Sequence, residues 1–133
     1  MDDMFVGRIM SEPVSTVRPE TTVREAARQM READIGSVVV VDDLDHIEGI
    51  LTSTDFVAAV ANERPLDETP VEAFMTEDVI TTHANQPVRD VADRMSEHGF
   101  HHLPVVEDEH VIGIVTTSDL TTHLAHREEP TLE

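Results

Sequence analysis

Apolar residues recur at helical spacing in two stretches of the chain. The residues that share this spacing are Val23, Ala26, Ala27 and Met30 in the first stretch and Val88, Val91, Ala92 and Met95 in the second. Apolar residues at i, i+3, i+4 and i+7 predict an amphipathic helix with one face on a core. Thr22 and Glu25 have the spacing of a capping box at the start of the first helix. Pro87 suits the first turn of the second helix, and Gly99 lies where the chain has to leave it.

Two short β-branched runs follow the first of these helices. They are Ser37 to Val41 and Ile47 to Thr52, and the acidic segment Asp42 to His46 separates them. Runs of this length and composition on either side of a turn predict a β-hairpin. The second half of the chain has the same pattern and is expected to contain the same hairpin.

Each hairpin leads into a closing helix. The first closing helix is expected to begin near Thr54 and the second near Ser118. The apolar side chains that these helices are expected to bury are Phe56, Val60, Leu120 and Leu124. Each half of the chain then reads strand, helix, strand, strand, helix, which predicts a mixed α/β fold.

The two halves are copies of one unit. The segments that correspond are 5–14 with 71–79, 23–30 with 88–95, 38–43 with 103–108, and 49–56 with 113–120. Four matched blocks in the same order indicate an internal repeat of about 60 residues. The predicted divisions are a first repeat over 1–64 with its N-terminal segment, a polar linker over 65–70, a second repeat over 71–126 and an acidic tail over 127–133. A repeat this short buries too little surface to be stable alone, so the two are expected to pack together with approximate twofold symmetry.

The composition excludes several classes of partner. Asp and Glu total 28 against 9 basic residues, and the formal net charge is −19. Nucleic acid is not an expected partner, because phosphate binding needs a basic face. Cysteine is absent, which excludes disulfides and thiolate metal sites. The apolar runs are too short to span a membrane and no signal peptide is visible, so a soluble, cytoplasmic protein is expected.

The negative charge suggests a salt-rich environment. Every basic residue other than histidine is an arginine. A charge this negative destabilises a compact fold by self-repulsion in dilute buffer. Molar salt shortens the Debye length to about 3 Å and screens that repulsion. The sequence therefore suggests a halophilic protein, and an acidic protein of a mesophile is the alternative.

A repeated motif is the strongest candidate for chemistry. Gly, two apolar residues, Thr, two residues and Asp occur in that order at Gly49 to Asp55 and again at Gly113 to Asp119. A helix N-terminus together with the hydroxyl of Thr52 or Thr116 suits a phosphate. The carboxylate can accept from both hydroxyls of a ribose, as acidic residues do in dinucleotide sites. The same spacing is also that of an ordinary capping box, and the motif alone leaves both interpretations open.

The whole pattern resembles a known family. Two copies of a Met-Ser/Thr start, a strand, an amphipathic helix, two strands and the motif above resemble tandem CBS domains, the Bateman module, over about residues 5 to 125. Phe100 to Val106 is similar to the second-strand motif of that family. The resemblance implies a regulatory module that binds AMP, ADP, ATP or S-adenosylmethionine between its repeats. It also implies pairing into a homodimer and a signal to a partner protein, whose identity is unknown.

The resemblance assigns roles to residues of both repeats. It implies that Asp55 and Asp119 hold the ribose, that Thr52 and Thr116 hold phosphates, that Thr16 and Thr81 frame the base, and that Ser37, His101 and His102 lie where basic side chains of the family often reach phosphates. His101 and His102 align with Gly36 and Ser37 of the first repeat. The two sites are therefore expected to be unequal. A phosphate-binding histidine would weaken binding as the pH rises through its titration near 6.5.

Two other classes of function remain as alternatives. One is a structural dimerisation module whose clefts are empty. The other is a metal sensor, since His123 and His126 are three apart on the last helix and other histidines cluster at His98, His101 and His102. No third ligand is identifiable, so no metal or cofactor is expected. No nucleophile elbow or Gly-rich phosphate loop is present either, so no enzymatic activity is expected.

Overall fold

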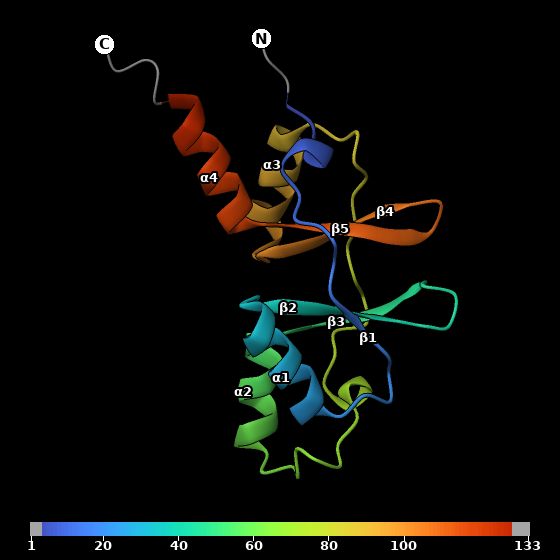
Figure 1. Ribbon diagram of the computed structural model, residues 1–133. Coiled ribbons are helices and arrows are strands. Elements are labelled where there is room, and N and C mark those ends of the chain that lie inside the picture. Colours follow the sequence, from blue (N-terminus) through green and yellow to red (C-terminus); the bar gives the residue numbers. More distant parts are fainter. Residues whose placement is uncertain (1–3, 129–133) are drawn as a thin grey trace. The chain divides into compact units, whose positions relative to one another are not determined.

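The computed structural model describes residues 4–128, with side chains described up to Ala125. The chain forms two compact units, and Figure 1 shows the elements of each. One unit comprises residues 14–79 and is called the central unit below. The other joins the N-terminal segment, up to Pro13, to the chain from Ile80 onward, and is called the terminal unit.

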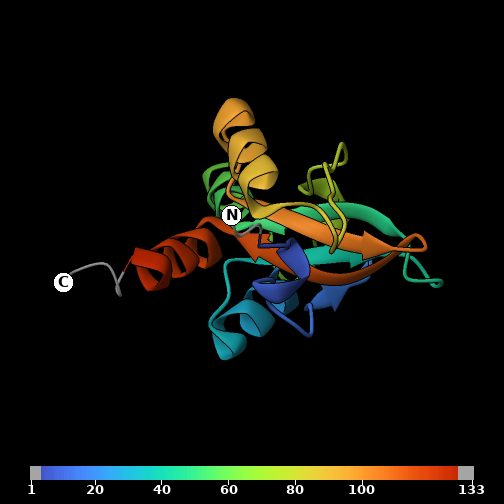
Figure 2. The same ribbon diagram turned by 90° about the horizontal axis from the view of Figure 1, so that it is seen from above.

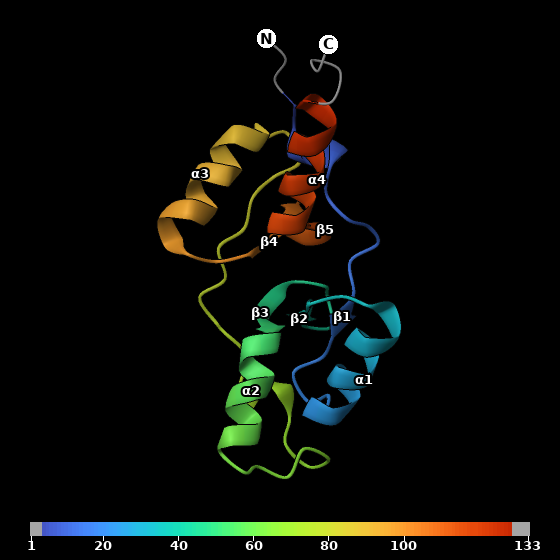
Figure 3. The same ribbon diagram turned by 90° about the vertical axis from the view of Figure 1, so that its left-hand side faces the viewer.

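The central unit is built on a three-stranded sheet. Its elements in chain order are β1 (Thr16–Val17), α1 (Val23–Ala33), β2 (Ser37–Val41), β3 (Ile47–Thr52), α2 (Ser53–Ala61) and the 3-10 turn η2 (Val71–Ala73). Strand β2 lies in the middle, parallel to β1 and antiparallel to β3. Helices α1 and α2 cover one face of this sheet (Figure 3). The buried core under them includes Val38, Val40, Leu51, Ala26 and Ala59.

The terminal unit repeats this plan with a smaller sheet. Its elements are η1 (Val6–Arg8), α3 (Val88–His98), β4 (His102–Glu107), β5 (His110–Thr116) and α4 (Thr117–Glu128). Strands β4 and β5 form an antiparallel hairpin, whose length is visible in Figure 2. The expected first strand of this repeat is reduced to one parallel bridge between Thr82 and Val105. The core contains Val6, Val91, Met95, Leu103, Val105 and Val115.

The opening segment of each repeat pairs with the hairpin of the other repeat. Ser11 N donates to Ile114 O at 2.8 Å, and Ile114 N donates back to Ser11 O at 3.2 Å. In the central unit, Thr76 N donates to Ile50 O at 2.9 Å and Ile50 N donates to Thr76 O at 3.0 Å. The compact units and the sequence repeats are therefore different divisions of the same chain.

Two glycines make this pairing possible. A Cβ atom on Gly49 would lie 2.6 Å from Met75 Sδ and 2.8 Å from Thr76 O. A Cβ atom on Gly113 would lie 2.7 Å from Met10 Sδ and 3.1 Å from Ser11 O. These separations are shorter than ordinary van der Waals contact, so the motif's glycine is needed for the close approach of a second backbone.

Both amphipathic helices form where the apolar spacing predicts them. Thr22 Oγ1 accepts from Glu25 N at 3.1 Å, but the Glu25 carboxylate bonds Arg28 at 2.7 Å, so only half of the expected capping box forms. Helix α3 ends at Gly99 with a φ of 75°, as the sequence predicts. Asp34 ends α1 with a φ of 57°, in the left-handed region that glycine adopts more easily.

Two of the four apolar residues expected to be buried by the closing helices are exposed. The side chain of Val60 is 63% exposed and that of Leu124 is 53% exposed, so both predictions were wrong. Ala59 is fully buried instead, and Phe56 and Leu120 pack against their cores. The reason is geometric: the short helix α2 presents positions 56 and 59, three residues apart, to the sheet, and position 60 lies to the side of that contact.

The segment predicted as a polar linker packs closely on the central unit. Val23 N donates to Thr69 O at 2.8 Å, and Arg24 N donates to Leu66 O at 3.1 Å. The side chain of Leu66 packs against the core, and Thr69 is only 2% exposed. Arg24 also forms an ion pair with Asp67. Residues 65–70 therefore belong to the central unit.

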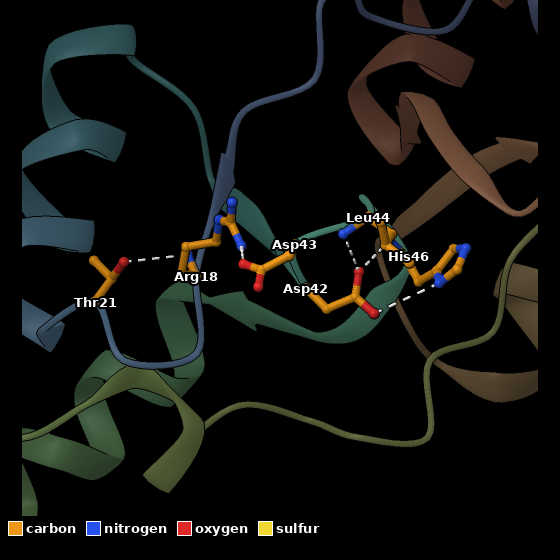
Figure 4. A network of polar contacts seen from close by, with 6 residues as sticks. All are labelled: Arg18, Thr21, Asp42, Asp43, Leu44 and His46. Carbon is orange, nitrogen blue, oxygen red and sulfur yellow. Dashed lines mark hydrogen bonds and ion pairs between the residues drawn. The ribbon is translucent and has the colours of Figure 1, made fainter.

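The acidic turn between β2 and β3 is tied by its first carboxylate, as Figure 4 shows. Asp42 Oδ1 accepts from Leu44 N at 2.8 Å and from His46 N at 2.9 Å. The bond from the His46 backbone is the main cause that lowers the pKa of Asp42 below its usual value. Arg18 pairs with the neighbouring Asp43. This side-chain-to-backbone bonding fixes the turn and so the register of the hairpin.

Among the residues described, no helix has the length and apolar character needed to cross a membrane.

Candidate functional site

The two copies of the repeated motif form caps at the starts of α2 and α4. Thr116 N donates to Asp119 Oδ2 at 2.9 Å, and Asp119 N donates to Thr116 Oγ1 at 3.2 Å. Thr52 N donates to Asp55 Oδ2 at 2.8 Å in the matching capping box of α2. The capping interpretation of the motif is therefore correct. The backbone bond of each cap occupies only one oxygen of the Asp55 or Asp119 carboxylate.

The second oxygens of the two carboxylates differ. Asp119 Oδ1 accepts from Ser11 Oγ at 3.3 Å. No bond to Asp55 Oδ1 is found among the residues described. Burial raises the pKa of the Asp55 carboxyl, and the hydrogen bonds from Thr52 oppose that shift. Asp55 therefore has acceptor capacity left for a hydrogen-bond donor such as a ribose hydroxyl.

The two threonine hydroxyls also differ. Thr52 Oγ1 lies 3.4 Å from Asp55 Oδ2 and points its proton toward that carboxylate. Thr116 Oγ1 accepts from Asp119 N, and an acceptor for its own proton is not found in the described part of the chain. The Thr116 hydroxyl therefore remains able to donate to an anion such as a phosphate.

The register of each hairpin places a predicted residue of its first strand opposite the threonine of the repeated motif. Ser37 pairs with Thr52 across β2 and β3, and His102 pairs with Thr116 across β4 and β5. Each pair adjoins the start of the closing helix of its own unit. His101 is exposed, and its backbone oxygen accepts from Thr117 N at 3.1 Å. Six predicted residues thus fall into two matching clusters: Ser37, Thr52 and Asp55 in the central unit, and His102, Thr116 and Asp119 in the terminal unit.

His102 is partly buried and poorly satisfied. Its Nδ1 atom is buried and has no hydrogen-bond partner among the described residues. Burial lowers the pKa of His102, the neighbouring His101 lowers it further, and Asp119 partly opposes the shift. The titration of His102 therefore lies below the value near 6.5 that the sequence alone suggests. At neutral pH this imidazole is neutral, and it offers one donor and one acceptor.

Thr16 lies on β1, opposite Val39 of β2, and Thr81 directly precedes the bridge between Thr82 and Val105 of β4. Their backbone oxygens are bonded in matching ways, because Gln29 Nε2 donates to Thr16 O at 3.1 Å and an Arg94 nitrogen donates to Thr81 O at 3.2 Å. Gln29 and Arg94 occupy the same position of the repeat. Both threonine residues are half-buried.

A cavity of 380 Å³ lies beside Asp119 within the terminal unit. It is lined by Met4, Arg8, Ile9, Asp119, Thr122 and His123. Sequence reasoning missed Arg8 and Thr122 as candidates, and it considered His123 only as a metal ligand. Arg8 precedes Asp119 by more than a hundred residues, and only the pairing of the N-terminal segment with β5 brings the two together. In the described part of the chain, no group of three or more His, Asp or Glu side chains is placed to hold a metal ion.

The comparison with known families matches both repeats. The family model for the CBS domain matches residues 6–62 and 71–126, which together are most of the chain. The chain therefore belongs to the CBS domain family, as the sequence resemblance implied. CBS domain pairs are usually regulatory.

Curated relatives share the repeat pair at different lengths. An uncharacterized 17.7 kDa protein of Acidianus ambivalens is 39% identical over 120 residues, which is 90% of this chain and 72% of that protein. An L-aspartate semialdehyde sulfurtransferase of Methanocaldococcus jannaschii is 35% identical over 118 residues, which is 88% of this chain. This chain spans only 22% of that enzyme, so the likeness concerns one part of a longer protein.

One similar solved structure contains bound ligands. The CBS domain pair of protein MJ0100, solved in complex with 5′-methylthioadenosine and S-adenosyl-L-methionine, is 32% identical to this chain. It superimposes with a TM-score of 0.88 over 95% of this chain and 99% of that one. A mixed α/β pair of CBS repeats, the fold class predicted from the sequence, is therefore confirmed.

Proposed function

We propose that this chain is a regulatory module that binds adenosine-containing ligands and signals their presence to a partner protein. The observation that carries the proposal is the pair of matching clusters, each with a helix N-terminus, a threonine and a carboxylate that capping leaves partly free. The cavity beside Asp119 gives one of these clusters room for a ligand. The adenosine ligands of the related MJ0100 pair support the class of ligand.

Each group in a cluster has a chemical role in this proposal. The ribose hydroxyls donate to Asp55 or Asp119, which supply carboxylate acceptors. The free N–H groups and positive dipole end of α2 or α4 favour a negative group nearby. The Thr116 hydroxyl and His102 add donors in the terminal unit. Thr16 and Thr81, in the segments that adjoin β2 and β4, are proposed to frame the base.

The proposed signal is a shift in population. A ligand favours whichever conformation binds it more tightly, and the shift equals its difference in affinity for the two. A partner protein or a second copy of this chain would read that shift. The proposal includes no catalytic step.

Calorimetry with AMP, ATP and S-adenosylmethionine at high salt tests the proposal. Asp55→Asn and Asp119→Asn should each remove the binding event at their own cluster, because the amide has a single acceptor oxygen and the threonine N–H of the cap already uses it. Asn still offers one oxygen to the threonine N–H, so the cap is partly kept. Asp90→Asn is the matched control, since Asp90 lies in the first turn of α3 and outside both clusters.

Two outcomes would contradict this function. If no adenosine ligand binds the wild-type chain, the proposal fails. If both cluster variants bind with unchanged stoichiometry, the carboxylates are only caps.

A structural dimerisation module is the second candidate, and one surface favours it. The side chains of Val57 and Val60 are 68% and 63% exposed on neighbouring turns of α2. Exposed apolar groups on one helix face favour association with a partner. Analytical ultracentrifugation of Val60→Asp separates the candidates: a monomeric variant that still binds nucleotide supports the ligand-binding function and places the homodimer contact on α2.

A further inference from the structure

The cavity beside Asp119 combines one carboxylate with an arginine and a histidine. Arg8 and His123 lie on its wall, together with Thr122 and the apolar side chains of Met4 and Ile9. The backbone that carries Arg8 is held in place, since Arg8 N donates to Phe5 O at 2.9 Å in the turn of η1. Gly7 N, one residue earlier, donates to Ala84 O at 2.9 Å. Arg8 therefore stands on a fixed part of the terminal unit.

The guanidinium of Arg8 is not used by the described part of the protein. Other arginines are committed: Arg18, Arg24 and Arg28 form ion pairs, Arg94 bonds Thr81 O, and Arg64 stacks over Phe74. No hydrogen bond or ion pair to the Arg8 side chain is found within residues 4–125. An arginine without a partner among the described residues, in a chain of net charge −19, is available to an anionic ligand.

The repeat supplies an internal comparison. Asp119 corresponds to Asp55, and the residues that correspond to Arg8, Thr122 and His123 are Ala73, Ala58 and Ala59. Ala59 is fully buried and offers no polar group. The guanidinium of Arg64 lies 5.4 Å from the centre of the Phe74 ring, which is next to Ala73 in the chain. The central unit thus has the same carboxylate but has alanine at the positions of Arg8 and His123, which line the Asp119 cavity.

We infer that the two proposed sites take different ligands, with phosphorylated adenosine at Asp119 and adenosine ligands that carry no phosphate at Asp55. The inference rests on the proposed function, because it names what each proposed site binds. Arg8 is the specificity-determining residue. A guanidinium binds phosphate oxygens in a bidentate way, whereas a carboxylate without a nearby cation repels them.

In dilute buffer, where the surface charges are not screened, the rest of the surface strengthens this difference. The field of a strongly acidic protein lowers the local concentration of a polyanion such as ATP. A phosphorylated ligand therefore needs a local cation to offset that field. A neutral ligand such as 5′-methylthioadenosine is not affected by the net charge, so the Asp55 site needs no arginine to hold it.

Calorimetry with ATP and with 5′-methylthioadenosine, at one fixed ionic strength, tests the inference. Arg8→Ala should weaken ATP binding by about tenfold or more, because it removes a charge-assisted bond. It should leave 5′-methylthioadenosine binding unchanged. Arg8→Lys keeps the charge without the bidentate geometry and should fall between wild type and Arg8→Ala. Arg31→Ala is the control for net charge, since Arg31 lies at the end of α1 in the other unit.

Further variants assign the ligands to the sites. Asp119→Asn should remove ATP binding, Asp55→Asn should remove 5′-methylthioadenosine binding, and Ala73→Arg should raise the affinity of the Asp55 site for ATP. The inference is overturned if Arg8→Ala binds ATP as wild type does, or if Asp55→Asn is the variant that loses ATP. In those outcomes an adenosine ligand still binds and the proposed function stands. If neither ligand binds wild type, both fail.

Discussion

At the residue scale, Asp119 accepts hydrogen bonds from two directions. The Thr116 backbone bonds Oδ2, and the Ser11 hydroxyl bonds Oδ1. An N-terminal cap requires only the first of these bonds. With both oxygens anchored, the side chain has less rotamer freedom to lose when a ligand binds. Cap and ligand-binding group are therefore compatible roles for one residue, although the sequence alone presents them as alternatives.

The partly buried imidazole beside it leads to a prediction about pH. His102 should titrate below 6.5 in the folded protein, because burial and His101 both disfavour its protonated form. Asp119→Asn should lower the pKa of His102 further, since the Asp119 charge supports the protonated form. The titration of the imidazole resonances by NMR measures both effects. A bound phosphate should raise this pKa, so affinity for a phosphorylated ligand should increase as the pH falls through this lowered range.

The same shift sets the direction of a stability effect. A histidine whose folded pKa is lowered stabilises the fold fully above its unfolded value, near 6.5, and this contribution is lost as the pH falls through the folded pKa. A His102→Gln variant should therefore lose less stability than wild type on acidification through that window. A His102 resonance that titrates above 6.5 would contradict the argument.

At the element scale, the pairing of each opening segment with the other repeat's hairpin depends on backbone contact. Gly49 and Gly113 lie where this segment crosses β3 or β5, and a methyl group at either position would meet a methionine sulfur and a backbone oxygen. A side-chain sulfur can move aside more easily than a backbone oxygen can. The backbone oxygen therefore decides how costly a side chain at each position would be.

The two glycines should respond to substitution to different degrees. Gly49→Ala should lower the free energy of unfolding by about 1 to 3 kcal/mol. Gly113→Ala should cost less, because its Cβ would lie 3.1 Å from the backbone oxygen rather than 2.8 Å. Urea denaturation measures both, with Glu48→Ala on the exposed face of β3 as the control. Equal stability of Gly49→Ala and the control would show that the segments do not need this close approach.

Elements with a local cause could be predicted from the sequence. Strands β2 and β3 have the bounds expected from their β-branched runs, because the acidic turn between them is closed by its own carboxylate. Helix α3 ends at Gly99, because a left-handed residue is needed there. The clusters around Asp55 and Asp119 follow from the capping motif and the hairpin register, both of which depend on residues close in the chain.

Features that depend on distant contacts could not be predicted. The exposure of Val60 depends on which side of α2 meets the sheet, and the apolar character of a residue does not determine that side. Arg8 lies beside Asp119 because the opening segment of the first repeat pairs with the hairpin of the second repeat, and the opening segment of the second repeat pairs with the hairpin of the first. Two similar repeats offer two equivalent partners for such a segment, so the sequence does not say which one it joins.

At the scale of the whole molecule, the net charge of −19 acts on every element at once. We propose that the protein is adapted to a salt-rich environment. The three ion pairs between arginine and carboxylate described here are all exposed, and such pairs contribute little stability. Screening by salt is therefore the main means of reducing the repulsion among the carboxylates.

Stability should rise with salt concentration. The free energy of unfolding should increase as potassium chloride is raised toward molar concentration, where the Debye length is about 3 Å. Sucrose at matched water activity is the control, because it favours burial without screening charge. Full stability in dilute buffer, with no gain on adding salt, would remove the halophilic interpretation.

The exchange of opening segments also fixes an order of events during synthesis on the ribosome. The central unit is one continuous stretch, so all of its parts have been made once Val79 has left the exit tunnel. The terminal unit needs residues 4–13, but β5 is translated a hundred residues later. Residues 4–13 are therefore made before the central unit but can join the terminal unit only after β5 and α4 have been made, so the cavity beside Asp119 forms late.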